Sequence, residues 1–412
     1  MIAGAKLHCP QPLSCLCCSA LQSPFSSAMS SPVTSVSGSA AAIQPAYLRG
    51  PGSGSQAPLP WLPAASAVRP CSGIAADAGA NGAAAAQPMS LRLFRSVWGV
   101  EGDLFDFFRS SLASGSAYVG FEAGPVNCTE HQLRALARCQ SELGLEFAAM
   151  VFSDIPAKPL RTVDEHLAEI QSQIRAVLAL QQSHGLKATH INCHSGKDTW
   201  SMREHERFFA SLLEWTAALP VPVFHETHRS RSLFHPTSTA ALVRKFPELL
   251  LTADLSHWVV VCGRLGVMDE PCSSDDGEAE GAASSSGDSA ASSAVPTWLS
   301  VIAPRVRHIH ARVGYEHGPQ VPDPRAPEYS AQVAAHERWW ELIFAERAKA
   351  GAKSISLVPE WGPHAKGGYY LHTTPFTNQP VADIAELADW TASRMQHKFI
   401  EGGRAAAAKE SV

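Results

Sequence analysis

The chain has 412 residues, of which 45% are hydrophobic, and its formal net charge is -5. No apolar run reaches the ~18 residues that a membrane-spanning helix needs, so we expect no membrane partner. The ten cysteines are scattered, and five of them precede residue 89. This pattern argues against a secreted domain held together by disulfides. We therefore expect a globular protein of a reducing compartment.

Residues 1–88 differ in composition from the rest. They are mostly Ala, Ser, Pro and Gly, with three basic residues and one acid, Asp77. So little charge and so few periodic apolar positions cannot offset the entropy of ordering, so we predict disorder here. A Ser- and Ala-rich, weakly basic segment is typical of an organelle transit peptide, and the scarcity of Arg favours chloroplast over mitochondrion. A low-complexity extension of a cytoplasmic protein, or translation from Met89, is the alternative.

Charge is also distributed unevenly along the chain. Residues 269–294 contain seven acids and no base among Ser, Ala and Gly, which predicts a disordered acidic insert. The leader contributes +2 and the insert -7, so the rest of the chain is neutral. A neutral body lacks the basic stripe that phosphate backbones require, so we expect no nucleic acid partner.

From residue 91 onward, short apolar runs alternate with longer helical patterns. In the segment 163–183, for example, Ile170, Ile174 and Val177 lie on one helical face. The alternation predicts one closed α/β barrel of the (β/α)8 TIM type over residues 89–400, with a flexible tail at 401–412. An open doubly wound sheet is the alternative, but the glycine-rich phosphate turn expected of it is missing. The predicted strands are 91–98, 117–122, 145–153, 189–194, 221–226, 249–254, 306–311 and 354–360.

Polar residues gather where the last five predicted strands end. In a (β/α)8 barrel these ends meet at one mouth, where the chemistry is located. Carboxylates and imidazoles that converge there suit one divalent metal ion, Mn²⁺, Mg²⁺, Co²⁺ or Zn²⁺. The segments are HINCH at 190–194, HETHR at 225–229, DLSH at 254–257, HIHAR at 308–312 and EWGP at 360–363.

The segments HETHR, DLSH, HIHAR and PEWGP, in this order, resemble the xylose isomerase-like barrels, and the resemblance covers roughly residues 91–397. They are most similar to the sugar (phosphate) isomerase/epimerase branch of that superfamily. One divalent metal lies there between a Glu, an Asp, a His and a second Glu on strands five to eight. The resemblance implies the ligands Glu226, Asp254, His310 and Glu360. It also implies that His257, the family's D-x-x-H histidine, and Arg312 contact substrate.

Further residues of the predicted mouth are less specific. His194, His228 and Trp361 are candidate substrate contacts, although a packed aromatic is the commoner outcome for a Trp. Asp254 could merely cap the following helix. His308 and His310 face the same way along a strand, and we expect His308 to lie one layer deeper.

The resemblance implies a metal-dependent isomerase or epimerase acting on a small sugar, a sugar phosphate or a related hydroxy-carbonyl compound. Glu226 and Glu360 would be the catalytic base and acid of a proton transfer through a cis-enediolate. Two alternatives stay open. One is an endonuclease IV-like, metal-dependent phosphodiesterase on abasic DNA, and the other is a catalytically silent barrel. The sequence also leaves open a homo-oligomer.

Overall fold

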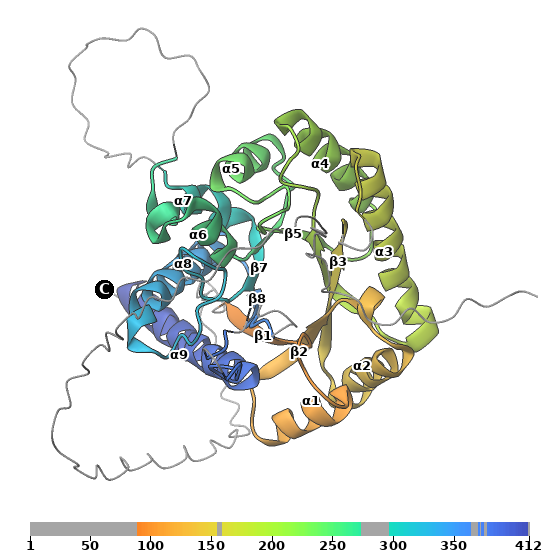
Figure 1. The fold of residues 1–412 in the computed structure, drawn as a ribbon, viewed down its shortest axis with the longest axis vertical. Coiled ribbons are helices and arrows are strands. Elements are labelled where there is room, and N and C mark those ends of the chain that lie inside the picture. The colour runs from red at the N-terminus through yellow and green to blue at the C-terminus, as the bar shows by residue number, and fades with distance from the viewer. Residues whose placement is uncertain are drawn as a thin grey trace, which may run out of the picture. The chain divides into compact units, whose positions relative to one another are not determined.

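Eight parallel strands form a closed barrel (Figure 1). The computed structural model describes residues 89–154, 159–272, 296–363, 370, 372–374 and 377–410, without the side chains of 401–410. Each strand pairs with the next along the chain, and β1 also pairs with β8, which closes the sheet. The strands are β1 (Ser90–Ser96), β2 (Tyr118–Ala123), β3 (Glu146–Phe152), β4 (Ala188–His194), β5 (Val223–Glu226), β6 (Leu251–Ala253), β7 (Val306–His310) and β8 (Ser354–Val358). The predicted (β/α)8 fold is confirmed.

Helices follow the strands and form a ring around the barrel (Figure 1). Capping boxes start α2 and α3, at Thr129 and Thr162, and a glycine with positive φ ends each of them. None of the helices within the described residues is both long and apolar enough to cross a membrane. The helices are α1 (Leu104–Ala113), α2 (Glu130–Leu143), α3 (Val163–His184), α4 (Met202–Thr216), α5 (Pro236–Lys245), α6 (Ser256–Cys262), α7 (Trp298–Ile302), α8 (Ser330–Lys349) and α9 (Ile384–Glu410).

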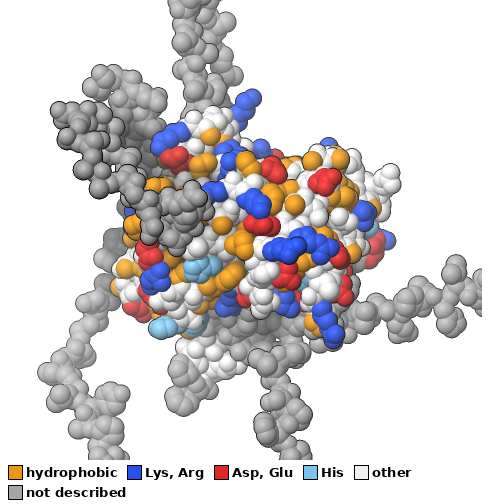
Figure 2. Space-filling model, turned by 90° about the horizontal axis from the view of Figure 1, so that it is seen from above, with side chains coloured by type: hydrophobic (Ala, Val, Ile, Leu, Met, Phe, Trp, Pro, Cys, Tyr) orange, Lys and Arg blue, Asp and Glu red, His pale blue; other side chains and the backbone are white. Residues whose placement is uncertain are grey.

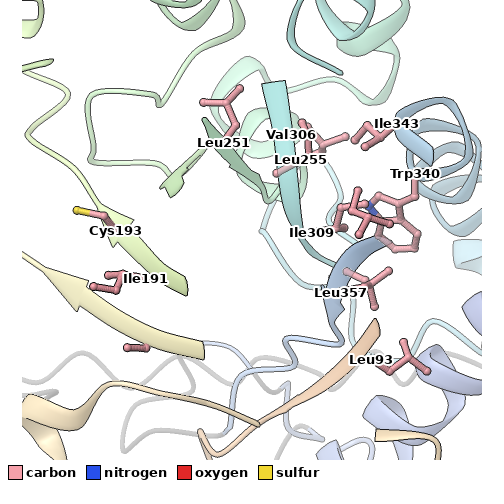
Figure 3. Close-up of a cluster of buried hydrophobic side chains, with 14 of the residues drawn as sticks. Leu93, Ile191, Cys193, Leu251, Leu255, Val306, Ile309, Trp340, Ile343 and Leu357 are labelled. Atoms are coloured by element: carbon pink, nitrogen blue, oxygen red, sulfur yellow. The ribbon is translucent and has the colours of Figure 1, made fainter. Parts of the chain in front are cut away.

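The main hydrophobic core lies between the strands and the helices. Successive side chains of a strand point to opposite faces, so every second residue points outward. Ile309 of β7 and Leu357 of β8 belong to this core and lie beside Trp340 of α8 (Figure 3). Each is at most 2% exposed, and burying a side chain of this kind stabilises the fold by about 1.5–3 kcal/mol.

The inside of the barrel is mainly polar. A small apolar cluster of Phe94, Ala148 and Val358 lies within it. The ring of Phe94 packs edge-on against the imidazoles of His190 and His308, with centroids 5.6 and 6.4 Å apart. Carboxylates and imidazoles occupy the next inward positions toward the carboxyl ends of the strands, so Phe94 forms the floor beneath them.

The start of the predicted acidic insert is folded, which corrects the prediction for residues 269–272. Asp269 accepts hydrogen bonds from Arg338 and from the indole N–H of Trp339 in α8, at 2.6 and 3.3 Å. Pro271 forms an antiparallel bridge with Thr297. This part of the segment is folded because Arg338 and Trp339 of α8 donate hydrogen bonds to its first acid, Asp269. Residues 273–294 and the predicted leader, 1–88, lie outside the described residues.

The C-terminal helix is longer than predicted. α9 runs to Glu410, through most of the segment 401–412 that was expected to be a flexible tail. The four consecutive alanines at 405–408 account for this, because Ala has the highest helix propensity.

Candidate metal centre

Three carboxylates and one imidazole meet at the carboxyl ends of β5 to β8. Glu226 ends β5, Asp254 follows β6, His310 ends β7 and Glu360 lies two residues beyond β8. One donor atom of each lies within 4.8 Å of the others, and all four residues are buried. The structure therefore brings together the four residues that the resemblance implies. We call them the four-donor centre.

Glu226 and Asp254 are held by different local contacts. Nδ2 of Asn192 donates to Oε2 of Glu226 at 2.6 Å. Oδ1 of Asp254 accepts from the backbone N–H and the hydroxyl of Ser256, at 3.1 and 2.5 Å, at the start of α6. Oδ2 of Asp254 accepts from the Arg312 guanidinium. Asp254 thus both stabilises the helix start and faces the centre, because its two oxygens serve different partners.

His310 lies between carboxylates on both sides of its ring. Its Nδ1 is 3.0 Å from Oε2 of Glu360 and 3.5 Å from Oε2 of Glu226. Its Nε2 is 3.1 Å from Oε1 of Glu122, which belongs to β2. A carboxylate that accepts from one ring nitrogen fixes the ring and leaves the other nitrogen for a metal.

Sequence reasoning missed Glu122. Its signal was present, because the second predicted strand ends on an acid just as the fifth does. His308 also points toward Glu122, with 3.2 Å between Nε2 and Oε2, and its Nδ1 lies 2.6 Å from the hydroxyl of Ser356. His308 is therefore one layer deeper than His310, as expected.

Burial and neighbouring charges move the two carboxyl pKa values in opposite directions. Burial raises the pKa of Glu226, but the imidazoles of His194 and His310 outweigh it, and the net pKa lies well below the usual range. Burial raises the pKa of Asp254 to about 6, although the Arg312 guanidinium opposes the rise. Glu226 is therefore ionised at neutral pH, whereas Asp254 takes up a proton in mild acid.

The pKa values of His310 and His257 are also shifted in opposite directions. Burial lowers the pKa of His310, but the carboxylates of Glu122 and Glu360 outweigh it, and the net pKa is well above the usual range. Burial and the nearby His228 and Arg312 hold the pKa of His257 well below its usual range. His257 is thus a neutral imidazole at neutral pH.

A divalent cation fits the four-donor centre. Oε1 of Glu226, Nδ1 of His310 and Oε2 of Glu360 are buried and have no hydrogen-bond partner among the described residues. Four buried carboxylates, those of Glu122 and the centre, lie among several imidazoles and a single buried guanidinium, that of Arg312. Buried charge without compensation is costly, and buried polar atoms without partners call for an ion or water. Mixed oxygen and nitrogen donors match Mn²⁺, Co²⁺ or Zn²⁺ most closely.

Arg312 and His257, the two implied substrate contacts, lie directly beside the centre. Nη2 of Arg312 is 3.3 Å from Oε2 of Glu360 and 2.9 Å from Nε2 of His257. Because the guanidinium can only donate, Nε2 of His257 accepts and its Nδ1 carries the proton. This Nδ1 is buried without a hydrogen-bond partner among the described residues, so it is a donor that a substrate oxygen could satisfy.

The other predicted mouth residues separate into two groups. His194 and His228 lie beside Glu226, with donor atoms of all three within 4.8 Å of one another. Trp361, in contrast, is fully buried in the hydrophobic core, and its indole N–H donates to Thr391 of α9 at 3.0 Å. This placement contradicts its prediction as a substrate contact. Glu360 points inward, so its chain neighbour Trp361 points outward.

Tyr370 is an aromatic residue that sequence reasoning did not single out. The guanidinium of Arg312 lies over its ring, 5.1 Å from the centroid, and the residue is 9% exposed. It comes from the loop after β8, a part of the chain without periodic pattern, so no signal in the sequence marked it.

No family model and no curated protein matches the sequence. Among solved structures, the IOLI protein with a bound zinc atom is 12% identical, with a TM-score of 0.46, over 75% of this chain and 99% of that one. For 3-keto-D-glucoside 4-epimerase YcjR from E. coli, the identity is 11% and the TM-score 0.42, over 75% and 100% of the two chains. Endonuclease IV from Thermus thermophilus is 14% identical, with a TM-score of 0.38, over 76% and 99%.

A (β/α)8 barrel hosts many reactions, so the reaction depends on the site and not on the fold. In its strand order, and in the Glu, Asp, His and Glu at the ends of β5 to β8, the chain resembles the xylose isomerase-like (β/α)8 barrels.

Proposed function

We propose that the protein is a divalent-metal-dependent isomerase or epimerase of a small sugar, a sugar phosphate or a related hydroxy-carbonyl compound. The observation that carries the proposal is the four-donor centre, which gathers excess buried negative charge and three polar atoms that have no hydrogen-bond partner within the described part of the chain. A metal bound by Glu226, Asp254, His310 and Glu360 would polarise a carbonyl and an adjacent hydroxyl of the substrate.

Glu226 is suited to accept the proton. Its low pKa keeps it ionised at neutral pH, and Asn192 holds one of its oxygens in place. Its other oxygen, Oε1, has no hydrogen-bond partner among the described residues and can receive a proton from the substrate carbon. Glu360, from a strand three places further around the barrel, can return a proton at the neighbouring carbon or on the opposite face. The first outcome isomerises the substrate and the second epimerises it.

Arg312 and His257 would orient the substrate. Both lie within hydrogen-bond distance of each other beside Asp254, and both can donate to hydroxyl or carbonyl oxygens. Such donors favour the enediolate, because negative charge develops on the substrate oxygens during proton transfer.

A second candidate, a metal-dependent phosphodiesterase, is favoured by one observation. His194 and His228 add potential ligands beside Glu226, and such enzymes use several metal ions. The surface does not support it equally. Figure 2 shows basic and acidic side chains intermingled on one side of the described barrel, whereas binding of a phosphate backbone requires a basic surface. We therefore rank this candidate second.

Solvent isotope exchange tests the proposal. The metal-loaded protein is incubated in deuterated water with a panel of ketoses, their phosphates and hydroxypyruvate-like acids, and products are read by NMR. We expect deuterium at a carbon next to the carbonyl for at least one compound, and exchange that is slower by about 10²–10⁴-fold for Glu226→Gln. An absence of exchange throughout the panel, together with nicking of abasic duplex DNA, would replace the proposal with the second candidate.

We also propose that residues 1–88 form an organelle transit peptide, in keeping with their near absence of acids. Fusion of this segment to a fluorescent reporter should direct it to the chloroplast. A diffuse cytosolic signal would contradict the proposal.

A further inference from the structure

Three arginines gather at the amino-terminal end of the barrel, the end opposite the four-donor centre. Arg305 ends the short 3-10 helix before β7, Arg307 is the second residue of β7, and Arg347 lies in the last turn of α8. Arg307 precedes the inward-pointing His308, so its own side chain points outward, toward the helices. We call these three residues the arginine cluster.

One backbone oxygen holds two of the guanidiniums side by side. Nη1 of Arg307 and Nη1 of Arg347 both donate to the carbonyl oxygen of Pro304, at 2.9 and 3.2 Å. Nη1 of Arg307 also donates to the carbonyl oxygen of Val306, at 3.0 Å. A carbonyl carries only partial charge, so these contacts orient the two guanidiniums and do not neutralise them.

The arginine cluster has no carboxylate partner among the described residues. In contrast, Arg338 of α8 and Arg394 of α9 each form an ion pair with an acid. Burial and the like charges of Arg347 and Arg305 lower the pKa of Arg307 to about 10. Three cations that are partly withdrawn from water therefore repel one another without a compensating anion.

Donor groups of the arginine cluster are left over for a ligand. Nε of Arg347 is buried and has no hydrogen-bond partner among the described residues. The hydrogen bonds to Pro304 and Val306 use only Nη1 of Arg307 and of Arg347, although a guanidinium has further N–H donors. All three arginines are also partly exposed, so a ligand can reach them from solvent. A buried donor without a partner calls for an ion or water.

We propose that the arginine cluster binds the phosphate group of a small molecule. The planar guanidinium matches two phosphate oxygens at once, and a phosphate dianion compensates the charge of two arginines. The cluster is compact, because Lys349, the next base on α8, is already paired with Glu346. Three neighbouring cations suit a single phosphate, whereas a nucleic acid or a lipid surface needs an extended basic patch.

This phosphate site is separate from the proposed chemistry. In a (β/α)8 barrel the reaction takes place at the carboxyl ends of the strands, where His310 ends β7. Arg307 lies at the start of the same strand, so a phosphate bound there is not the substrate of the four-donor centre. A ligand that binds only the folded chain stabilises it. The inference therefore goes beyond the proposed function and does not depend on it.

Phosphate titration tests the inference. The full chain is titrated with inorganic phosphate in a calorimeter, with ionic strength held constant by chloride. We expect one saturable site, and a dissociation constant about tenfold higher or more in Arg307→Gln and in Arg347→Gln, because each loses charged donors. Arg134→Gln, which changes an exposed arginine of α2 paired with Glu130, is the matched control and should bind as the wild type does.

A metal ion in the four-donor centre could also attract phosphate, so Asp254→Asn is titrated in parallel. Phosphate binding that persists in Asp254→Asn and weakens in the arginine variants supports the inference. Binding that disappears in Asp254→Asn and persists in the arginine variants overturns the inference and leaves the proposed function intact. A wild type without saturable phosphate binding overturns it as well, because the arginines then serve only backbone carbonyls.

Sedimentation with phosphatidic acid vesicles distinguishes a lipid headgroup from a free phosphate. We expect the wild type to remain in the supernatant. Co-sedimentation that Arg307→Gln abolishes would overturn the assignment to a small molecule.

A measurement on the wild type alone guards against variants that fail to fold. Phenylglyoxal modifies accessible guanidiniums, and mass spectrometry locates the modified residues. Phosphate should slow the modification of Arg307 and Arg347 and leave that of Arg134 unchanged. Equal modification of the arginine cluster with and without phosphate would overturn the inference.

Discussion

The inner and outer faces of the same strands follow opposite rules. Along β7, Ile309 points outward into the hydrophobic core, whereas His308 and His310 on either side of it point inward among carboxylates. All three are buried, so burial alone does not distinguish them. The outer face stabilises the fold through apolar area, while the inner face carries charges that burial penalises. Within one strand of the barrel, outward side chains therefore stabilise the fold, and the inward side chains between them form the site.

The largest effect is expected at the inner face, for Glu226→Gln. An amide of nearly the same shape cannot accept the proton, so solvent exchange should fall by about 10²–10⁴-fold, the usual contribution of a general base. NMR of substrate deuteration measures it. Glu142→Gln, at an exposed carboxylate of α2, is the matched control and should keep full activity. An equal loss of solvent exchange in Glu226→Gln and Glu142→Gln would contradict a specific role for the inward-pointing carboxylate.

At the outer face, Ile309→Ala should lower stability and leave chemistry intact. Removing a buried large aliphatic side chain costs about 2–5 kcal/mol of unfolding free energy. Denaturant unfolding gives this change, and zinc per folded chain should stay at the wild-type value. The adjacent His310→Asn should show the reverse pattern, with metal lost and a smaller change in stability. Metal loss in Ile309→Ala would show that the two faces are not independent.

Glu122→Gln should have a smaller effect, because Glu122 touches His310 and not the proposed ion. An amide accepts the imidazole N–H less strongly, so metal affinity should fall by about 10–100-fold. Competition with a fluorescent chelator measures the affinity. Glu146→Gln, in the neighbouring strand and paired with Arg92, provides the control. An unchanged affinity would remove Glu122 from the positioning of His310.

The smallest effect is a dependence of metal affinity on pH. The pKa of His310 lies well above its usual range, so metal binding near pH 7 should release one proton. Because the pKa of Asp254 is about 6, affinity should fall more steeply below that pH, as a second proton competes. A raised carboxyl pKa also means that the metal-free fold loses stability as pH rises from about 4 through about 6. Isothermal titration in several buffers measures the released protons, and a pH-independent affinity would contradict this account.

The sequence was sufficient for those features that follow from local periodicity. Alternation predicted the eight strands, the strand-end rule located the mouth of the barrel, and the resemblance to the xylose isomerase-like barrels implied the four donors that meet there. The same alternation could have excluded Trp361, which follows the inward-pointing Glu360 by one residue.

Other features depend on contacts between distant segments. Glu122 meets His310 across 188 residues, and Arg312 lies over Tyr370 in a loop without periodic pattern. The first acid of the insert, Asp269, is held by Arg338 and Trp339 of α8. None of these pairings has a local signature, because each depends on how the barrel closes.

Anomalous diffraction tests the central claim most directly. A crystal of the full chain grown with Zn²⁺ should show a peak within about 2.0–2.2 Å of ligand atoms of Glu226, Asp254, His310 and Glu360. A map at saturating Zn²⁺ without such a peak, in which Arg312 and protonated His310 alone neutralise these carboxylates, would contradict it.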